Sequence, residues 1–251
     1  MRGVTELAKI LSLPLVAAAA TARARGKGAS LVVSTTLAQV THTAQRPFVP
    51  LALVAALLGV VVAFAANKTI GATTFSGHLA QVLAVAVTRE LTPLVVSLVL
   101  VARTGNQLTI QLGLMRAGHE LDALEVSGID PYYFVVLPRV VGVTLGAMAL
   151  AVCCGAVGMI GGHGVARLIG ALGYTVTAAE VFNALAVRDL AIALLKSGLC
   201  GLLVASTSCH FALTAGRSPV GVREAAERAA LWGFALTLVI NLGLSVYGFA
   251  G

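Results

Sequence analysis

The chain has 251 residues, of which 58% are hydrophobic and only 11% are charged. A soluble domain carries about 25% charged residues, so this composition excludes an ordinary water-soluble fold and indicates that lipid surrounds most of the chain. The net charge of +7 does not indicate nucleic-acid binding, because the basic residues flank apolar runs and do not alternate with aromatic residues.

Residues 1–46 are predicted to form an N-terminal interfacial helix, over 1–28, and a polar lead-in to the membrane. Five later runs are apolar and long enough to cross a bilayer, which takes about 20 residues of helix. These predicted spans are 47–66, 79–102, 132–160, 190–213 and 229–249. The sequence therefore predicts one all-α domain, a polytopic membrane protein with five transmembrane helices.

The distribution of Lys and Arg predicts the orientation of the spans. Twelve of the 17 lie in segments 1–46, 103–139 and 214–228, whereas three lie in the alternate connections 67–78 and 161–188. Basic residues concentrate on the cytoplasmic side, so the N-terminus and the 103–139 loop are expected there, and the C-terminus on the opposite side.

Three charged residues fall inside predicted spans: Arg89, Glu90 and Lys196. Charges at this depth usually face a bundle interior or a wet cavity. Two interpretations remain open: a polar lining that meets a headgroup or couples motion, or an internal ion pair between Glu90 and Lys196 that only fixes helix packing. Adjacent helical residues diverge by about 100°, so Arg89 or Glu90 needs a partner elsewhere. Pro93 predicts a kink in the same span.

The 103–139 loop contains a second predicted helix, over residues 111–127, that ends before Gly128 and Pro131. Its expected apolar stripe has acidic neighbours, and anionic lipid would repel them. The pattern therefore favours docking on a protein partner over lying on the headgroups. The predicted contact residues are Met115, Glu120, Asp122 and Glu125.

Small residues recur at helical spacing in the third predicted span, at Gly142, Gly146, Gly158 and Gly162. Such a seam allows close helix packing, within the chain or with a second chain. Signatures of an enzyme are absent: no phosphate-binding GxxxxGK[ST] loop occurs, and the histidines and cysteines show no metal-ligand spacing. We therefore expect no catalytic residue, no metal and no directly bound cofactor.

Residues 89–139, RELTPLVVSLVLVARTGNQLTIQLGLMRAGHELDALEVSGIDPYYFVVLPR, resemble the MlaE/YrbE permeases, the membrane subunits of ABC transporters associated with MCE proteins. The matching features fall on Arg89-Glu90-Leu91 with Pro93, Ala102-Arg103 with Gly105, Gly113 with Met115, Glu120 through Glu125, Asp130-Pro131, and Pro138-Arg139. Thr92 replaces the usual glycine, and Gln111 stands where an acidic residue is common.

This resemblance implies a homodimeric permease in the bacterial cytoplasmic (inner) membrane. Separate cytoplasmic ATPase subunits would use the ATP, with the Glu120–Glu125 region as the coupling helix. An MCE protein beyond the membrane would exchange phospholipid or another hydrophobic lipid with a cavity of the dimer near Arg89, Glu90 and Lys196. Two alternatives from other classes stay open: an ATP-independent secondary transporter with a relay at Arg89, Glu90 and Lys196, and a structural membrane scaffold.

Overall fold

The computed structural model describes residues 2–24, 29–70, 86–168 and 187–250, and these ranges are helical and contain no strand. The chain belongs to the all-α class, as the composition predicts. Its elements are α1 (Arg2–Ala24), α2 (Ala29–Gln45), α3 (Phe48–Ile70), η1 (Ala86–Leu91), α5 (Thr92–Val99), η2 (Leu100–Gly105), α6 (Asn106–Ala117), α7 (Glu120–Val126), η3 (Tyr132–Val136), α8 (Leu137–Leu168), α10 (Val187–Thr214) and α11 (Pro219–Ala250). The three η elements are π-helical turns.

Four helical segments within the described residues are long and apolar enough to cross a membrane: Thr88–Ala117, Tyr132–Gly161, Val187–Thr214 and Pro219–Val246. A fifth span exists if α2 and α3, which meet at a bend of 45°, cross together. The chain is thus a polytopic helical membrane protein. The predicted polar turn at 67–78 begins as the last residues of α3, which ends at Ile70. The rest of that turn and most of the 161–188 connection lie outside the described residues.

The segment predicted as a polar lead-in, residues 29–46, is in fact helical over α2. Its hydroxyls explain why a Ser- and Thr-rich run can be helical at a membrane. Thr35, Thr36 and Thr41 each donate to a backbone oxygen four residues earlier, at 2.7–2.9 Å, so their polar groups are satisfied within the helix. Pro47 separates α2 from α3.

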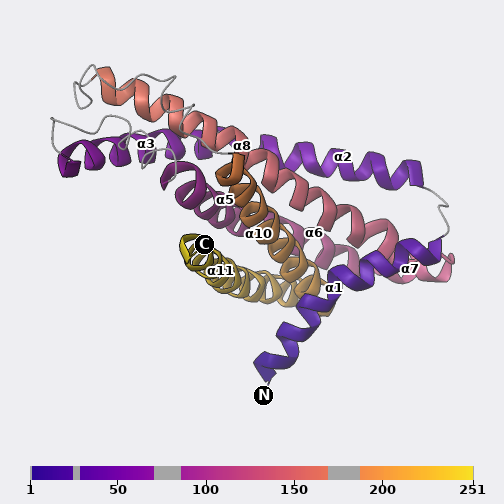
Figure 1. Ribbon diagram of the computed structural model, residues 1–251. Coiled ribbons are helices and arrows are strands. Elements are labelled where there is room, and N and C mark those ends of the chain that lie inside the picture. The colour runs from indigo at the N-terminus through magenta and orange to yellow at the C-terminus, as the bar shows by residue number, and fades with distance from the viewer. Residues whose placement is uncertain (1, 25–28, 71–85, 169–186, 251) are drawn as a thin grey trace.

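Helix α8 is the centre of the bundle. In Figure 1, α2 and α3 lie along one side of α8, and α11 lies beyond α10 on the other. Gly142 and Gly146 allow the approach of α2, because a Cβ atom on them would lie 2.6 Å from Gln39 and 2.8 Å from Thr43. This close packing is within the chain. Gly158 is buried, and the surroundings of Gly162 lie outside the described residues.

The span that begins at Thr88 is continuous through α5 and α6 to Ala117, well beyond the predicted end at residue 102. π-helical turns lie on both sides of Pro93, which occupies the start of α5. The predicted helix over 111–127 is not one helix. It is divided at Gly118 and His119, where His119 adopts a left-handed conformation with a φ of 60°.

Helix α1 packs against the end of the bundle that carries α7. Its Leu13 and Ala17 belong to the same buried cluster as Leu112 and Leu121. The opposite face of α1 is apolar and exposed, at Leu11 and Leu15. This two-sided pattern suits a helix that lies in the membrane interface with one face on the protein.

Candidate functional site

A cluster of charged side chains lies where η1, α10 and α11 meet. The Lys196 Nζ donates to both carboxylate oxygens of Glu90, at 2.9 Å each, and to the backbone oxygen of Arg89 at 3.2 Å. Its Nζ also donates to the hydroxyl of Ser245, at 2.9 Å, and that hydroxyl contacts Glu90. The side chain of Lys196 is only 1% exposed, so the carboxylate of Glu90 balances its charge within the protein.

Arg89 extends toward a different helix. Its Nη1 lies 3.6 Å from Asp189 Oδ1, and its Nε lies 3.6 Å from Glu90 Oε1. Asp189 is therefore the partner of Arg89 on another helix, which the divergence of Arg89 and Glu90 by about 100° led us to expect. The charge cluster, defined as Arg89, Glu90, Asp189 and Lys196, contains two cations and two anions and is neutral overall. Its geometry favours the interpretation of Glu90 and Lys196 as an internal ion pair.

Sequence reasoning brought Arg89, Glu90 and Lys196 together correctly but missed Asp189 and the polar residues of α11. Asp189 precedes Lys196 by seven residues, two helical turns, so the spacing alone places both on one face of α10. Asn241 and Ser245 are four residues apart on α11, and the Asn241 amide lies 3.2 Å from Cys200 Sγ. The same i, i+4 pattern would have identified this polar face.

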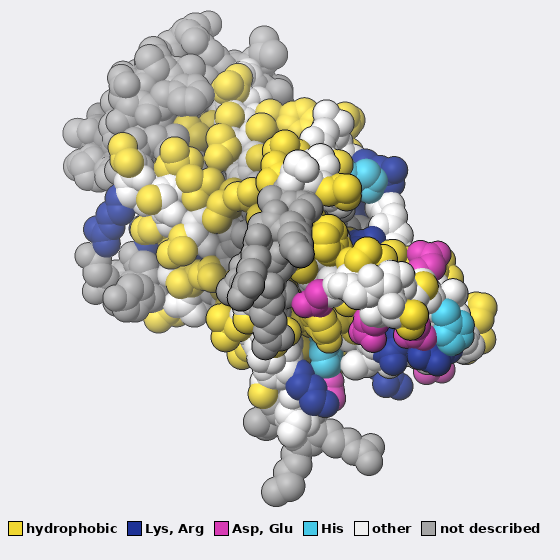
Figure 2. All heavy atoms as spheres, turned by 90° about the vertical axis from the view of Figure 1, so that its right-hand side faces the viewer, with side chains coloured by type: hydrophobic (Ala, Val, Ile, Leu, Met, Phe, Trp, Pro, Cys, Tyr) yellow, Lys and Arg dark blue, Asp and Glu magenta, His cyan; other side chains and the backbone are white. Residues whose placement is uncertain are grey.

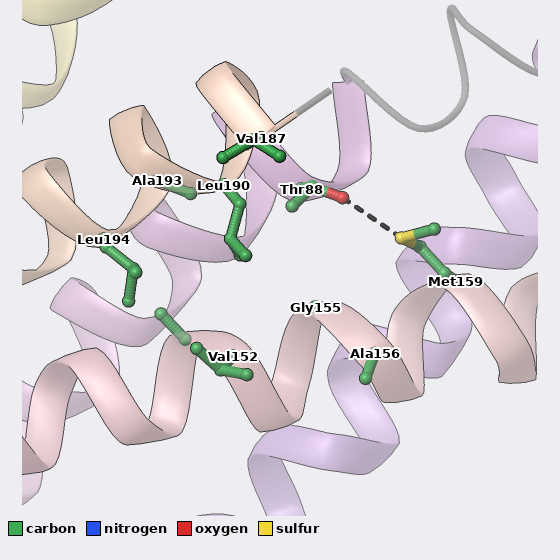
Figure 3. A pocket seen from close by; sticks show the side chains of 10 residues that line it. Thr88, Val152, Gly155, Ala156, Met159, Val187, Leu190, Ala193 and Leu194 are labelled. Atoms are coloured by element: carbon green, nitrogen blue, oxygen red, sulfur yellow. Dashed lines mark hydrogen bonds between the residues drawn. The ribbon is translucent and has the colours of Figure 1, made fainter. Parts of the chain in front are cut away.

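An apolar pocket of about 280 Å³ lies beside the charge cluster, between α8 and α10. Figure 3 shows the labelled side chains of α10 on one side of this pocket and those of α8 on the other. Thr88, next to Arg89, closes one end, and its hydroxyl lies 3.2 Å from Met159 Sδ. None of the three predicted cavity residues lines this pocket, so their role in holding a lipid stays a prediction.

The predicted coupling residues divide into two groups. Glu120 and Glu125 are exposed on α7, and Val126 beside them is 90% exposed. Asp122 is instead engaged within the chain, since His119 Nδ1 lies 2.8 Å and Arg217 Nη2 3.0 Å from its Oδ2. The hydrogen bond with His119, together with the positive charge of Arg217, holds the pKa of Asp122 below its ordinary value. Asp122 therefore links α7 to the connection between α10 and α11.

Met115 does not share a surface with these residues. It lies on α6, before the break, and packs against the core cluster while its Sδ lies 3.5 Å from Arg139 Nη2. The apolar stripe expected on one continuous helix is also wrong, because Leu112 is fully buried and Val126 is almost fully exposed. The left-handed residue at His119 turns α7 away from the axis of α6 and separates the two faces.

Charged side chains are concentrated at one end of the molecule. Figure 2 shows acidic, basic and histidine side chains gathered in one part of the face, while hydrophobic side chains cover most of the remaining described surface. Among the residues that the structure describes, no group of three His, Cys, Asp or Glu side chains could hold a metal ion. The molecule is thus a bundle of apolar spans with one charged end and one enclosed charge cluster.

These features define a multi-pass helical membrane protein with an enclosed charge cluster. The sequence model of the family described as Permease MlaE matches residues 36–247, and the chain belongs to this family. The match covers the four unbroken candidate spans, the charge cluster and α7. The chain is accordingly a multi-pass membrane protein of a permease family.

Curated relatives agree with this family. A probable ABC transporter permease protein of Synechocystis sp. is 32% identical over 181 residues, which are 72% of this chain and 68% of the relative. The Arabidopsis thaliana protein TRIGALACTOSYLDIACYLGLYCEROL 1, chloroplastic, is 28% identical over 68% of this chain and 49% of its own length. A probable ABC transporter permease protein of Rickettsia felis is 28% identical over 65% of this chain and 63% of the relative. The chain thus spans about half to two thirds of these relatives.

Proposed function

We propose that this chain is the membrane subunit of an ATP-driven ABC transporter that moves a phospholipid or a related hydrophobic lipid. The apolar pocket between α8 and α10 carries the proposal, because a cavity of about 280 Å³ bounded by aliphatic side chains suits an acyl chain. The neutral charge cluster at its edge gives a polar boundary. Support for the substrate class comes from the Arabidopsis relative, whose name is that of a glycolipid.

The ATPase of this transporter is a separate cytoplasmic subunit, and this chain itself binds no cofactor and catalyses no reaction. Its docking surface is the exposed acidic part of α7, at Glu120 and Glu125. Movement there reaches the bundle through Leu121, which is buried in the core cluster, and through the link from Asp122 to Arg217. α11 begins two residues after Arg217 and ends near the charge cluster, so it connects the two sites.

The remaining partners follow from the family resemblance and the charge distribution. The permease acts as a homodimer in the bacterial inner membrane, with its N-terminus in the cytoplasm and its C-terminus on the opposite side. An MCE protein on that opposite side supplies or receives the lipid. The pocket lies close to the ends of α8 and α10 that are expected to face this partner.

Filling the apolar pocket tests the proposed function. Ala156→Phe places a phenyl ring in the pocket lining, and we expect ATP-dependent lipid transfer between donor and acceptor vesicles to fall about tenfold. The measurement uses the permease reconstituted with its ATPase. Association with the ATPase should stay unchanged, because Ala156 lies in the second half of α8, whereas α7 precedes the start of that helix.

Leu145→Phe is the matched control, since it adds a phenyl ring to the same helix at an exposed position outside the pocket. Equal transfer by Ala156→Phe and the unmodified chain would contradict the proposal. Transfer of lipid by the chain alone, driven by an ion gradient and without the ATPase, would instead establish the secondary transporter. Loss of complex assembly without any effect on transfer would indicate a scaffold.

A further inference from the structure

A second cavity, of about 510 Å³, lies at the bend between α2 and α3. We call it the bend pocket. Its polar lining comes from the bend, from η2 and from α6, and includes His42, Arg46, Arg103, Asn106, Gln107 and Gln111. It shares no residue with the apolar pocket beside Thr88, and nothing in the charge cluster lines it.

The bend pocket is positively charged, and the charge cluster is not. Arg46 and Arg103 line the bend pocket, with no acidic residue among its described lining residues. Within the described ranges of the chain, neither arginine forms an ion pair with an acidic side chain. Arg89 and Lys196, in contrast, are balanced by Asp189 and Glu90. An anion therefore gains more electrostatic binding free energy at the bend pocket than beside Arg89.

The positions of Arg46 and Arg103 indicate what kind of ligand their charges can bind. Arg103 lies within the span Thr88–Ala117, and Arg46 lies between the two halves of the bent pair. Arg46 and Arg103 are both exposed, and both belong to the segments that the charge distribution assigns to the cytoplasmic side. They face one cavity at the level expected for lipid headgroups, where an anionic ligand can reach both guanidinium groups.

The side chains also determine the chemistry of that ligand. Guanidinium groups match the geometry of phosphate oxygens with paired hydrogen bonds, and the amides of Asn106 and Gln107 can donate to further oxygens. Ile110 lines the bend pocket, and Val49 and Leu53 on α3, which follow the lining residue Pro47, are 73% and 61% exposed. A lipid fits both features, with its headgroup between the arginines and its acyl chains along α3.

We propose that the bend pocket binds the phosphate-bearing headgroup of an anionic lipid, at a site separate from the pocket between α8 and α10. The proposed orientation places the bend pocket nearer the cytoplasmic half of the membrane than the charge cluster. This inference refines the lipid substrate of the proposed function, but it concerns binding alone. It can be tested without the ATPase, and its failure would leave the transport test unaffected.

The experiment measures lipid retention by the full chain. The chain is purified in detergent with equal amounts of phosphatidylglycerol and phosphatidylcholine, and bound lipid is identified by native mass spectrometry. We expect preferential retention of phosphatidylglycerol, and a loss of about tenfold or more in that preference for Arg46→Gln with Arg103→Gln, as expected when charge-assisted hydrogen bonds are lost. The variant with Arg46→Lys and Arg103→Lys keeps both positive charges but loses the paired hydrogen bonds that a guanidinium group donates. It should retain an intermediate preference for phosphatidylglycerol. It also tests the proposal if the glutamine variant does not fold.

The matched control is Arg223→Gln with Arg228→Gln, which also removes two positive charges but from exposed ion pairs on α11. Unchanged retention in the control supports a local site. An equal loss in the control, or full retention of phosphatidylglycerol by the Arg46 and Arg103 glutamine variant, would overturn the proposal. Displacement of the lipid by millimolar inorganic phosphate would overturn the assignment to a lipid headgroup and assign the pocket to a soluble phosphate.

Discussion

Lys196 is the least exposed of the charged side chains that the structure describes, and its Nζ has four oxygen atoms as neighbours. An ammonium group has three N–H donors, so these neighbours satisfy it completely. A charge held this way contributes little net stability relative to an apolar residue, but removing one partner leaves the other charge buried and unbalanced. The pair with Glu90 is therefore a point where single substitutions are costly.

Lys196→Met should lower the free energy of unfolding by about 3–5 kcal/mol, because Glu90 would lose its counterion inside the bundle. Adding Glu90→Gln to the same variant should restore most of this loss. Thermal unfolding of the purified chain in detergent measures both effects. If the double variant is no more stable than Lys196→Met alone, the ion pair is not the reason for the loss.

Arg223→Ala provides a surface comparison for that experiment. Its ion pair with Glu227 joins side chains that are 83% and 64% exposed, so it should change stability by less than about 1 kcal/mol. Lipid transfer by the Lys196→Met and Glu90→Gln double variant adds a second measurement. A stable variant that no longer transfers lipid would assign the charge cluster a role in transport as well as in packing.

The contacts that Asp122 makes with His119 and Arg217 depend on pH. The pKa of Asp122 is lowered in the folded protein, so its link to His119 and Arg217 is present above the ordinary carboxyl pKa of about 3.9 and is lost as the pH falls through the lowered value. We expect Asp122→Asn to expose the amides of α7 to hydrogen exchange at neutral pH as strongly as acid does in the unmodified chain. Exchange rates corrected for pH measure this, and equal protection at neutral pH in both chains would contradict the link.

At the scale of the elements, hydropathy predicted where the apolar helices lie, but not how they begin, bend and end. The predicted spans 132–160 and 190–213 fall within η3–α8 and α10, because a bilayer requires a long uninterrupted apolar run. The break at His119 was not predicted, because a left-handed conformation is uncommon for a residue other than glycine and the hydropathy pattern does not signal it. The helix α2 was missed because its polar side chains bond to their own backbone.

The consequence of that break is that α7 is a short, separate helix, and its exposed acidic residues are the natural contact for a positively charged groove. Reversing their charge with Glu120→Lys and Glu125→Lys should abolish copurification of the ATPase and lipid transfer together. Folding should be unaffected, because both side chains are exposed. A pull-down from membranes that express both subunits measures the association.

Glu224→Lys with Glu227→Lys is the control for α7, since these exposed acids lie on α11 and form only surface ion pairs. It changes the net charge by the same amount. Retained copurification in the α7 variant would contradict docking at Glu120 and Glu125. Loss in both variants would show that net charge, rather than α7, determines the association.

At the scale of the whole molecule, the four unbroken candidate spans differ in how much of their apolar surface the rest of the chain buries. Only 22% of the apolar window of α11 is buried, compared with 50% for the spans that begin at Thr88 and Tyr132 and 61% for α10. The exposed face of α11 includes Val239, Leu242 and Val246, and Gly243 has open space beside it. Small and aliphatic residues of this kind allow close packing of transmembrane helices. This face is therefore where we expect the second copy of a homodimer to lie.

Crosslinking tests this arrangement. In a chain with the exposed Cys153 changed to alanine, Leu242→Cys should form a disulfide-linked dimer in membranes under mild oxidation, because the two α11 helices would bring symmetry-related residues together. Leu57→Cys is the control, since Leu57 is similarly exposed and its helix α3 lies across α8 from α11. Dimers formed equally well by both variants would reflect random collision in the membrane, and dimers formed only by Leu57→Cys would place the interface on α3. Only a dimer specific to Leu242→Cys joins the α11 helices of two copies, and these helices contact the charge cluster of each copy through Ser245.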